Sequence, residues 1–247
     1  MRGARIDCFV TTPANRLAQI TYDGTRWGAW ADRAGTVTNR PSCVPASSGL
    51  GLDCFATGTD KALWRRQFDG TAWRTWQKVG GVTTIRPECV RVGTAVHCFV
   101  VDGSKNLMTR RLSGSTWGAW TKIGAGFGLP PQCLVASGKM DCFAQSSGGQ
   151  LLKGYHDGTS WQAWTNQGGD VFAQPYCSRL STGFDCYWTT SAFTLVRRQR
   201  IGTTWQTAVD LGGTVQQRPV CLARNDGARI DCLARGTDNT LKQRSYY

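Results

Sequence analysis

Cysteines are the residues of this chain whose number and spacing predict chemistry most directly. There are eleven in 247 residues, and ten of them form pairs nine or eleven positions apart. Neighbouring thiols in an oxidising compartment form disulfides, whereas zinc sites use closer spacings such as Cys-x-x-Cys. The pairs lack that spacing, and only His97 and His156 could assist a metal. We expect disulfides and no metal, the alternative being reduced cysteines that act as small core residues.

Hairpin geometry accounts for the separation of nine. Where Gly93-Thr94 forms a two-residue loop, counting outward along both strands brings Cys89 opposite Cys98. By alternation this is a non-hydrogen-bonded pair, in which the Cα atoms are about 4.5 Å apart and a disulfide can form. Two extra loop residues keep the same parity. The expected disulfides are Cys43 with Cys54, Cys89 with Cys98, Cys133 with Cys142, Cys177 with Cys186, and Cys221 with Cys232.

Cys8 is left without a partner, and the strand that would carry one is not in the sequence. We therefore expect the chain to be a cut through a longer array, and an unpaired Cys8 or an open strand edge would allow two copies to associate. Disulfides also predict a secreted or extracellular protein. The residues before Cys8 contain no apolar signal region, so we expect that the signal peptide is not present in this chain.

Acid–base chemistry is poorly supported. The chain has a single glutamate, Glu88, whereas a glycosidase normally needs two carboxylates in distinct roles. A hydrolase nucleophile motif, a zinc-protease motif and a phosphate-binding loop are all missing from the sequence. An aspartate precedes the second cysteine in nearly every unit, which indicates a structural role: Asp7, Asp53, Asp141, Asp185 and Asp231. We expect a protein without catalytic residues or cofactor, a sialidase-like glycosidase being the less favoured alternative.

Tryptophans and arginines are the candidates for binding. Eleven tryptophans are present, most of them in a recurring Trp-x-x-Trp segment. Along a strand, an offset of three directs the two rings to opposite faces, so we expect one to pack between blades and the other to line a groove. An aromatic ring can stack on the apolar face of a sugar, and arginine can bond its hydroxyl groups. The candidate sugar-binding residues are Trp27, Trp30, Trp73, Trp76, Trp117, Trp120, Trp161, Trp164, Arg65, Arg66, Arg110, Arg111, Arg197 and Arg198.

Both sets have an alternative interpretation. The tryptophans could be core residues between successive units, and the arginines could form a solvated strand face. Ala208 replaces the second tryptophan of the last complete unit, so a weaker site is expected there.

These residues recur with a period of 44 to 46 residues, and each unit contains four strand-like segments. In one unit the expected strands are Arg86 to Val92, Ala95 to Val101, Leu107 to Leu112, and Trp117 to Ile123, separated by turn signals. Four-stranded antiparallel sheets repeated at this length are the blades of a β-propeller.

The sequence therefore predicts an all-β, single-domain propeller with six blades, the first and last incomplete. The repeat units are 1–35, 36–81, 82–125, 126–169, 170–213 and 214–247. The alternative is five blades closed by the N-terminal Trp-x-x-Trp strand. No run of apolar residues is long enough for a membrane span.

The formal net charge of +13 predicts attraction to polyanions such as acidic polysaccharides. Nucleic acid is not favoured as a partner, because the arginines are spread over the units and disulfides argue against an intracellular partner.

The segment from Cys54 to Arg66, followed by Asp69-Gly-Thr-Ala-Trp-Arg-Thr-Trp76 and Gly80-Gly81, resembles the repeat of bacterial PLL-type propeller lectins. That repeat reads Phe-x-x-Gly-x-Asp-x-x-Leu, then Trp-x-x-Trp and Leu-Gly-Gly. The resemblance implies a seven-bladed parent that binds fucose or related sugars in pockets between blades. The cysteine pairs depart from the family pattern.

Together these features predict a non-enzymatic, multivalent lectin that binds fucose-type or acidic glycans on cell surfaces or glycoproteins. The alternative is a secreted module that binds protein or cell wall as part of a larger enzyme.

Overall fold

The computed structural model describes residues 5–46, 50–224 and 229–246. All regular structure in these residues is β-strand, in six antiparallel sheets that follow one another along the chain. None of them belongs to a helix that could cross a membrane. The expectation about a signal peptide concerns in part residues 1–4, which lie outside the described residues. The chain divides into two compact units, Met1–Ala125 and Gly126–Tyr247, each of which is described by itself.

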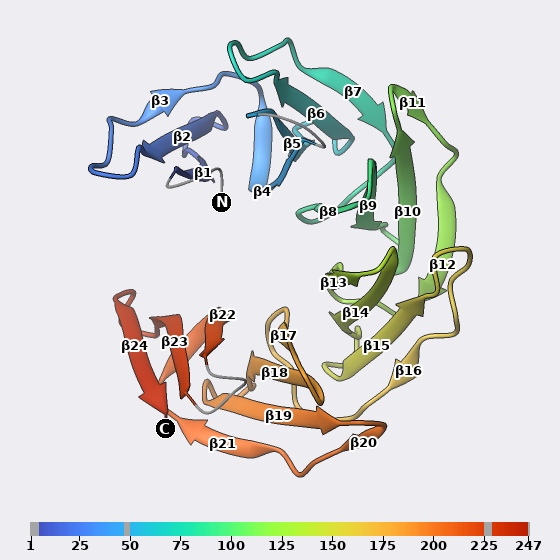
Figure 1. Ribbon diagram of the computed structural model, residues 1–247, viewed down its shortest axis with the longest axis vertical. Coiled ribbons are helices and arrows are strands. Elements are labelled where there is room, and N and C mark those ends of the chain that lie inside the picture. Colours follow the sequence, from blue (N-terminus) through green and yellow to red (C-terminus); the bar gives the residue numbers. More distant parts are fainter. Residues whose placement is uncertain (1–4, 47–49, 225–228, 247) are drawn as a thin grey trace. The chain divides into compact units, whose positions relative to one another are not determined.

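The first unit contains three sheets (Figure 1). The first sheet consists of β1 (Ile6–Thr11), β2 (Leu17–Tyr22) and β3 (Ala31–Asp32). The second consists of β4 (Val37–Pro45), β5 (Leu52–Gly58), β6 (Leu63–Phe68) and β7 (Gln77–Gly80). The third consists of β8 (Glu88–Val92), β9 (Ala95–Val101), β10 (Asn106–Ser113), β11 (Thr116–Trp117) and β12 (Thr121–Ala125).

The second unit contains the other three sheets. The fourth consists of β13 (Gln132–Ala136), β14 (Lys139–Gln145), β15 (Leu151–His156) and β16 (Thr165–Asn166). The fifth consists of β17 (Tyr176–Leu180), β18 (Gly183–Thr189), β19 (Leu195–Ile201), β20 (Thr204–Trp205) and β21 (Val209–Gly212). The sixth consists of β22 (Val215–Arg224), β23 (Arg229–Gly236) and β24 (Leu241–Tyr246).

This is the six-bladed β-propeller that the repeat predicts, with three strands in the first and last blades. The five-bladed alternative is wrong, because β3 pairs with β2 of its own sheet and places Ala31 opposite Gln19. The seven-bladed parent stays a prediction.

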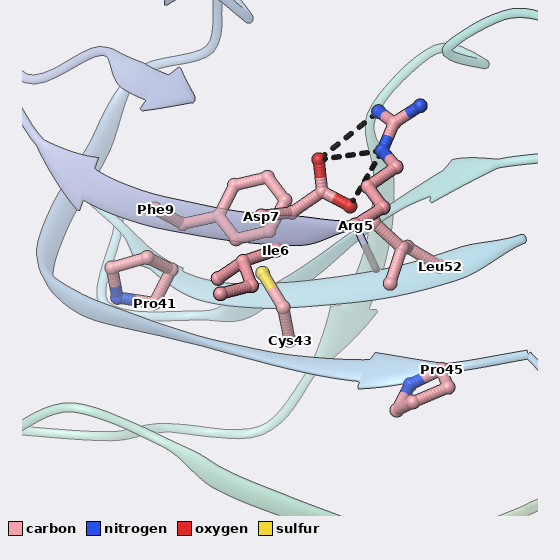
Figure 2. A pocket seen from close by; sticks show the side chains of 8 residues that line it. All are labelled: Arg5, Ile6, Asp7, Phe9, Pro41, Cys43, Pro45 and Leu52. Carbon is pink, nitrogen blue, oxygen red and sulfur yellow. Dashed lines mark hydrogen bonds and ion pairs between the residues drawn. The ribbon is translucent and has the colours of Figure 1, made fainter. Parts of the chain in front are cut away.

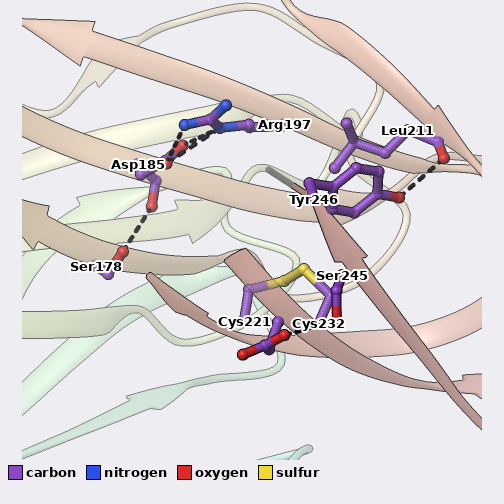
Figure 3. The surroundings of a disulfide bond; sticks show 9 residues. Ser178, Asp185, Arg197, Leu211, Cys221, Cys232, Ser245 and Tyr246 are labelled. Carbon is purple, nitrogen blue, oxygen red and sulfur yellow. Dashed lines mark hydrogen bonds and ion pairs between the residues drawn. A yellow bond between two sulfur atoms is a disulfide. The ribbon is translucent and has the colours of Figure 1, made fainter. Parts of the chain in front are cut away.

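All five expected disulfides are present. Cys89 and Cys98 are paired residues of β8 and β9 with Cα atoms 4.1 Å apart, which confirms the hairpin parity. Figure 3 shows the bridge between Cys221 and Cys232, which joins β22 to β23. Cys8 is exposed and free, as expected. Each disulfide therefore joins the first two strands of one blade.

The core lies between consecutive sheets. In the first unit, Phe55 of the second sheet and Val96 of the third belong to one buried cluster. In the second unit, Phe143 of the fourth sheet meets Phe184 of the fifth edge to face, with ring centroids 5.2 Å apart. Within each unit, these repeats therefore bury apolar faces against the next repeat, as solenoid-like arrays do.

Polar contacts link the same neighbours. The backbone NH of Cys89 donates to Ser42 Oγ at 2.9 Å, and the backbone NH of Cys177 donates to Gln132 Oε1 at 2.6 Å. In both cases the residue before one blade's first cysteine holds the first cysteine of the next blade.

The aspartates before the second cysteines have the expected structural role. Asp53 accepts bonds from Arg65 of its own sheet at 2.6 Å and from Arg91 of the next sheet at 2.7 Å. Asp141 in the same way pairs with Lys153 at 3.0 Å and with Arg179 of the next sheet at 2.9 Å. These buried or nearly buried carboxylates form ion pairs within their own blade and with the next blade, and the ion pairs link the two blades.

The fourth strand is interrupted, which corrects the expectation for the Trp-x-x-Trp segment. In the third sheet Trp117 pairs with Leu112, whereas Thr121 pairs with Thr109. The fourth strand thus advances four residues while β10 advances three, so it accommodates one extra residue as a bulge. A bulge reverses the alternation of sides, and the two tryptophan rings come to the same side of the sheet.

Candidate functional site

An arginine of the third strand stacks with both tryptophans of its own sheet. The Cζ atom of Arg110 lies 5.7 Å from the ring centroid of Trp117 and 5.9 Å from that of Trp120. The equivalent contacts are Arg66 over Trp73 at 5.7 Å, Arg66 over Trp76 at 5.9 Å, and Arg198 over Trp205 at 5.4 Å. These distances are those of cation–π contacts.

Backbone carbonyls hold the same guanidinium groups. Arg110 Nε donates to the carbonyl of Gly118, in the bulge, at 2.6 Å, and its Nη1 donates to the carbonyl of Val79 in the preceding sheet. Arg198 repeats this pattern with Gln206 at 2.8 Å and Gln167 at 2.5 Å. The arginine thereby provides a hydrogen-bond donor for a carbonyl group of the bulge, and it links its sheet to the preceding sheet. A further part for these residues in sugar binding stays a prediction.

The fourth sheet has a glycine in this position. Gly154 pairs with Cys142 just as Arg110 pairs with Cys98. Without the arginine, the rings of Trp161 and Trp164 stack directly, with centroids 5.9 Å apart and planes inclined by 13°. The two rings of the Trp-x-x-Trp segment therefore lie on the same side of the sheet whether or not an arginine is in contact with both.

The second tryptophan also packs on the linker from the preceding sheet. A Cβ atom on Gly81 would lie 2.6 Å from the ring of Trp120, and one on Gly35 would lie 2.5 Å from Trp76. The linker glycine that the ring covers is therefore required at both positions. In the fifth sheet, Ala208 stands where the second tryptophan would be. The ring of Trp188, in β18, covers the linker there instead, and it would lie 3.3 Å from a Cβ atom on Gly169.

We predict that Gly81→Ala destabilises the protein much more than Gly114→Ala. Both glycines have positive φ, +76° and +58°, but nothing lies within 4 Å of a Cβ at Gly114. The backbone conformation costs about 1 kcal/mol in each variant, and the overlap with Trp120 brings the loss for Gly81→Ala to about 3 kcal/mol. Urea denaturation measures both values, and equal losses would contradict the packing role of Trp120.

The remaining arginine candidates separate into two groups. Arg65 and Arg197 bind aspartates of their own sheets, Asp53 at 2.6 Å and Asp185 at 2.7 Å; Figure 3 shows the latter pair. Arg111 is exposed on the opposite side of β10 from Arg110.

Trp27 and Trp30 are the most exposed of the tryptophan candidates, at 50% and 54% of their surface. They belong to the first sheet, so no earlier sheet of their unit packs against them. Trp27 rests on Tyr22, with ring centroids 5.4 Å apart. Neither ring lines either of the hollows described below.

A hollow of about 410 Å³ is formed by residues of the second sheet and by the linker that leads to it from the first sheet. We call it the Trp64 niche. It is lined by Trp64 and Trp76, the turn residues Thr59 and Asp60, the linker residues Gly35 and Thr36, and Val37 at the start of β4. Its volume is in the range of small-molecule sites, and its lining combines aromatic surface with a few polar groups.

The local sequence positions Trp64. Asp60 Oδ1 accepts hydrogen bonds from the indole Nε1 of Trp64 at 3.0 Å and from the backbone NH of Ala62 at 3.1 Å. A Cβ on Gly58 would lie 2.6 Å from that indole nitrogen, so only glycine allows this approach. The aspartate and the glycine of one tight turn together determine where the ring lies.

Asp60 is ionised in this setting. Lys78 Nζ lies 2.8 Å from Asp60 Oδ2. Hydrogen bonds from Lys78 and Trp64 lower the pKa of Asp60 to about 2. A charged acceptor is therefore available at the niche throughout the neutral and mildly acidic range.

Sequence reasoning did not select Trp64 and Asp60. It favoured residues that recur in every unit, whereas Gly-Thr-Asp followed by Leu and a long side chain occurs in only two repeats, at 58–64 and 236–242. The restriction of this motif to two repeats was the signal that could have identified Trp64 and Asp60. Of the candidates named from the sequence, Trp76 is the one that lines the niche.

Figure 2 shows another hollow, of about 350 Å³, beside β1. Arg5 and Asp7 point toward one another there and are joined at 3.0 Å, and the other lining residues are largely apolar. The charged groups of this hollow are already paired with each other.

Features suggestive of catalysis or metal binding have structural explanations. The carboxylate of Asp69, in one Asp-Gly-Thr-x-Trp turn, accepts the backbone NH groups of Thr71 and Ala72, both at 2.8 Å. Asp157 accepts those of Thr159 and Ser160 in the same way, at 2.8 Å. Within the described residues, no group of three or more His, Cys, Asp or Glu side chains could hold a metal ion.

The fold is similar to that of several lectins of known structure. The BP39L lectin from Burkholderia pseudomallei matches with a TM-score of 0.84 over 98% of this chain and 77% of its own, at 14% identity. The Aleuria aurantia lectin, a six-bladed propeller with fucose recognition, matches with a TM-score of 0.72 over 98% and 87%, at 14% identity. This chain has the β-propeller fold of those lectins.

A third match is AofleA from Arthrobotrys oligospora, with a TM-score of 0.68 over 100% of this chain and 80% of the other, at 11% identity. No protein-family model and no curated protein matches the sequence. At these identities the likeness establishes the fold, and the function has to be argued from the chain's own residues.

Proposed function

We propose that this protein is a non-enzymatic, carbohydrate-binding lectin and that the Trp64 niche is a sugar site. The observation that carries the proposal is the meeting of two tryptophan rings and an ionised carboxylate in one hollow beside the linker that joins two consecutive blades. Three propeller lectins have the same fold, and the Aleuria aurantia protein is described as fucose-specific.

The niche supplies both halves of sugar recognition. An indole ring packs against the C–H face of a pyranose, which is apolar. The carboxylate of Asp60 accepts hydrogen bonds from sugar hydroxyls, and a charged acceptor makes these bonds roughly twice as strong as neutral ones. The hydroxyls of Thr36 and Thr59 add donors and acceptors at the edge. Fucose, a deoxy sugar with an apolar methyl group, fits this combination.

The proposal includes no catalytic step. Asp60 is the one carboxylate among the lining residues of the niche, and hydrolysis of a glycosidic bond normally requires two. The five disulfides favour an extracellular location. The net charge of +13 favours an acidic cell surface or polysaccharide as the wider setting, with more than one site contributing avidity.

A glycan array, followed by calorimetry with methyl α-fucoside, tests this function. We expect binding at physiological salt, and we expect Asp60→Asn to weaken it by about 10-fold, because the amide keeps the bond from Trp64 but removes the charge. Asp157→Asn changes an aspartate of the second unit outside the niche and should leave affinity unchanged.

Two outcomes would exclude a lectin. Absence of signal for every glycan, at low and at physiological salt, would favour a protein- or cell-wall-binding module. Signal that disappears for every ligand at moderate salt would show that net charge, and not the niche, is responsible.

A further inference from the structure

Two phenylalanine side chains of the second unit are exposed next to one another. Phe172 lies in the linker between β16 and β17, and Phe193 lies in the turn between β18 and β19 (Figure 1). They are exposed over 48% and 37% of their surface, and their rings meet edge to face with centroids 5.3 Å apart. We call this pair the phenylalanine platform. The fifth sheet has a neighbouring sheet before it and after it in the same unit, so this exposure does not come from a missing neighbour.

Neither ring is required by the repeat. The turn places one residue with positive φ in every blade, and the residues there in the other blades are Asn15, Lys61, Lys105, Gly149 and Asn239. At the linker position of Phe172, five residues before the first cysteine, the other blades have Thr38, Thr84, Gly128 and Gln216. In this sequence the fifth blade alone carries an aromatic residue at either position, and it carries one at both.

Phe193 is held in a backbone conformation that lowers stability. Its φ of +61° lies in the left-handed region, which glycine and asparagine tolerate and which is rare for a bulky side chain. Residues held in this way collect at ligand-binding sites, where the surrounding structure maintains them. Here the backbone NH of Phe193 donates to the carbonyl of Thr190 at 3.0 Å, and its carbonyl accepts the NH of Val215 at 2.8 Å. The turn therefore fixes an exposed ring at a cost in stability.

The linker holds the second ring in the same manner. The backbone NH of Phe172 donates to the carbonyl of Thr189 at 2.8 Å, and Gln145 Nε2 donates to the carbonyl of Phe172 at 2.9 Å. The backbone on which each ring is mounted is thus fixed before a ligand arrives. Such preorganisation reduces the entropy that binding would otherwise lose.

A carboxylate accompanies the two rings. Asp170 Oδ2 accepts the backbone NH of Ser191 at 3.0 Å and its hydroxyl at 2.6 Å. Asp170 is two residues before Phe172 and Ser191 is two residues before Phe193, so the same two segments carry the carboxylate and both rings. Asp170 is exposed, and no described residue donates to its Oδ1. That oxygen can accept a hydroxyl group of a ligand.

The platform lies at the same place in the fifth blade as the Trp64 niche does in the second. Asp170 matches Thr36 in its spacing before the next cysteine, and Ser191 matches Thr59 in its spacing after the preceding one. Thr36 and Thr59 both line the Trp64 niche. The linker and the turn that form one hollow in the second blade therefore present two rings and a carboxylate in the fifth.

The size of the platform favours a sugar over a protein partner. With about 200 Å² for a whole phenylalanine, the exposed fractions leave roughly 170 Å² of aromatic surface. A specific protein interface buries about 800 Å² on each partner. The platform is much smaller than that, but it is large enough to contact the apolar face of one pyranose ring.

We propose that the phenylalanine platform is a second carbohydrate site, in which the two rings contact the apolar parts of a neutral pyranose and Asp170 accepts one of its hydroxyls. This inference rests on the proposed lectin function for the class of ligand. The ring planes are inclined by 77°, so they form a corner with two apolar walls. A deoxy sugar such as fucose offers a C–H face to one wall and a methyl group to the other. The platform shares no residue with the Trp64 niche, so the two sites bind independently.

Site-resolved NMR titration with methyl α-fucoside tests the proposal. We expect the fucoside to shift the amide signals of residues 170–172 and 190–193 as well as those of the Trp64 niche. Phe193→Asn should weaken the binding reported by residues 170–172 by about 10-fold, because it removes one wall of the corner. Its urea midpoint should be at least as high as that of the wild type, since asparagine adopts positive φ more readily than phenylalanine.

Two controls accompany this variant. Lys105→Asn makes the same change at the same turn position of the third blade and should alter neither site. Asp60→Asn should alter only the affinity reported by the Trp64 niche, which shows that the two sites are read separately.

The outcomes separate this inference from the function on which it rests. If Phe193→Asn leaves the affinity at residues 170–172 unchanged and lowers the urea midpoint, the rings serve packing and the second site is wrong. If the fucoside binds at the Trp64 niche and moves no signal of the platform segments, the second site is wrong and the lectin function stands. If the wild-type protein binds no glycan on an array, both are wrong.

Discussion

Complete reduction of the five disulfides should unfold this protein at 25 °C. Each bridge closes a loop of nine or eleven residues. Loop-closure entropy gives about 2.7 kcal/mol for one such bridge and roughly 13 kcal/mol for the set. That sum is of the same size as the total stability of a typical domain, about 5–15 kcal/mol.

Near-ultraviolet circular dichroism during titration with a reductant measures this loss, because the tryptophan environments report on packing between blades. Thiol labelling of the unreduced, denatured protein is the control and should modify Cys8 alone. Native dichroism in protein whose eleven cysteines all react with label would show that the blades hold without the bridges.

Arg110→Ala should destabilise the protein by about 3 kcal/mol, because it removes cation–π contacts with two rings and charge-assisted bonds to two carbonyls. Arg111→Ala is the matched control: the neighbouring side chain is exposed, and its removal should have almost no effect. Arg110→Lys should recover little, because an ammonium group cannot reproduce a planar guanidinium between two rings.

Urea denaturation measures these differences, and sugar binding of the three variants provides a second readout. Equal stability of the Arg110→Ala and Arg111→Ala proteins would contradict the stacking role. Loss of sugar binding by folded Arg110→Ala protein would instead support the original expectation that this arginine contacts the ligand.

Features that depend on neighbouring residues in the chain were predictable. The register of Cys89 and Cys98 follows from counting outward from a two-residue turn, so the disulfides could be assigned from spacing alone. The structural role of Asp53 and Asp141 was also predictable, because an identical residue in nearly every unit points to the repeat itself.

The tryptophan faces were not predictable in this way. Strand periodicity assumes a continuous ladder, and the extra residue between Trp117 and Thr121 breaks it. The bulge puts Trp120 beside Trp117 with Arg110 against both rings. The insertion of one residue thus brings the two rings and the arginine together, and their part in sugar binding stays a prediction.

The sequence by itself determined the repeat, the pairing of its cysteines and the six-bladed architecture, since each of these arises from turns and strands that are local in the chain. The tertiary structure decided which residues share a hollow. Gly35 and Trp76 come from different repeats, and Trp64 enters the niche because Asp60 and Gly58 orient its ring beside the linker between two blades. Contacts of that kind depend on how one repeat packs against the next, which the pattern within a single repeat does not contain.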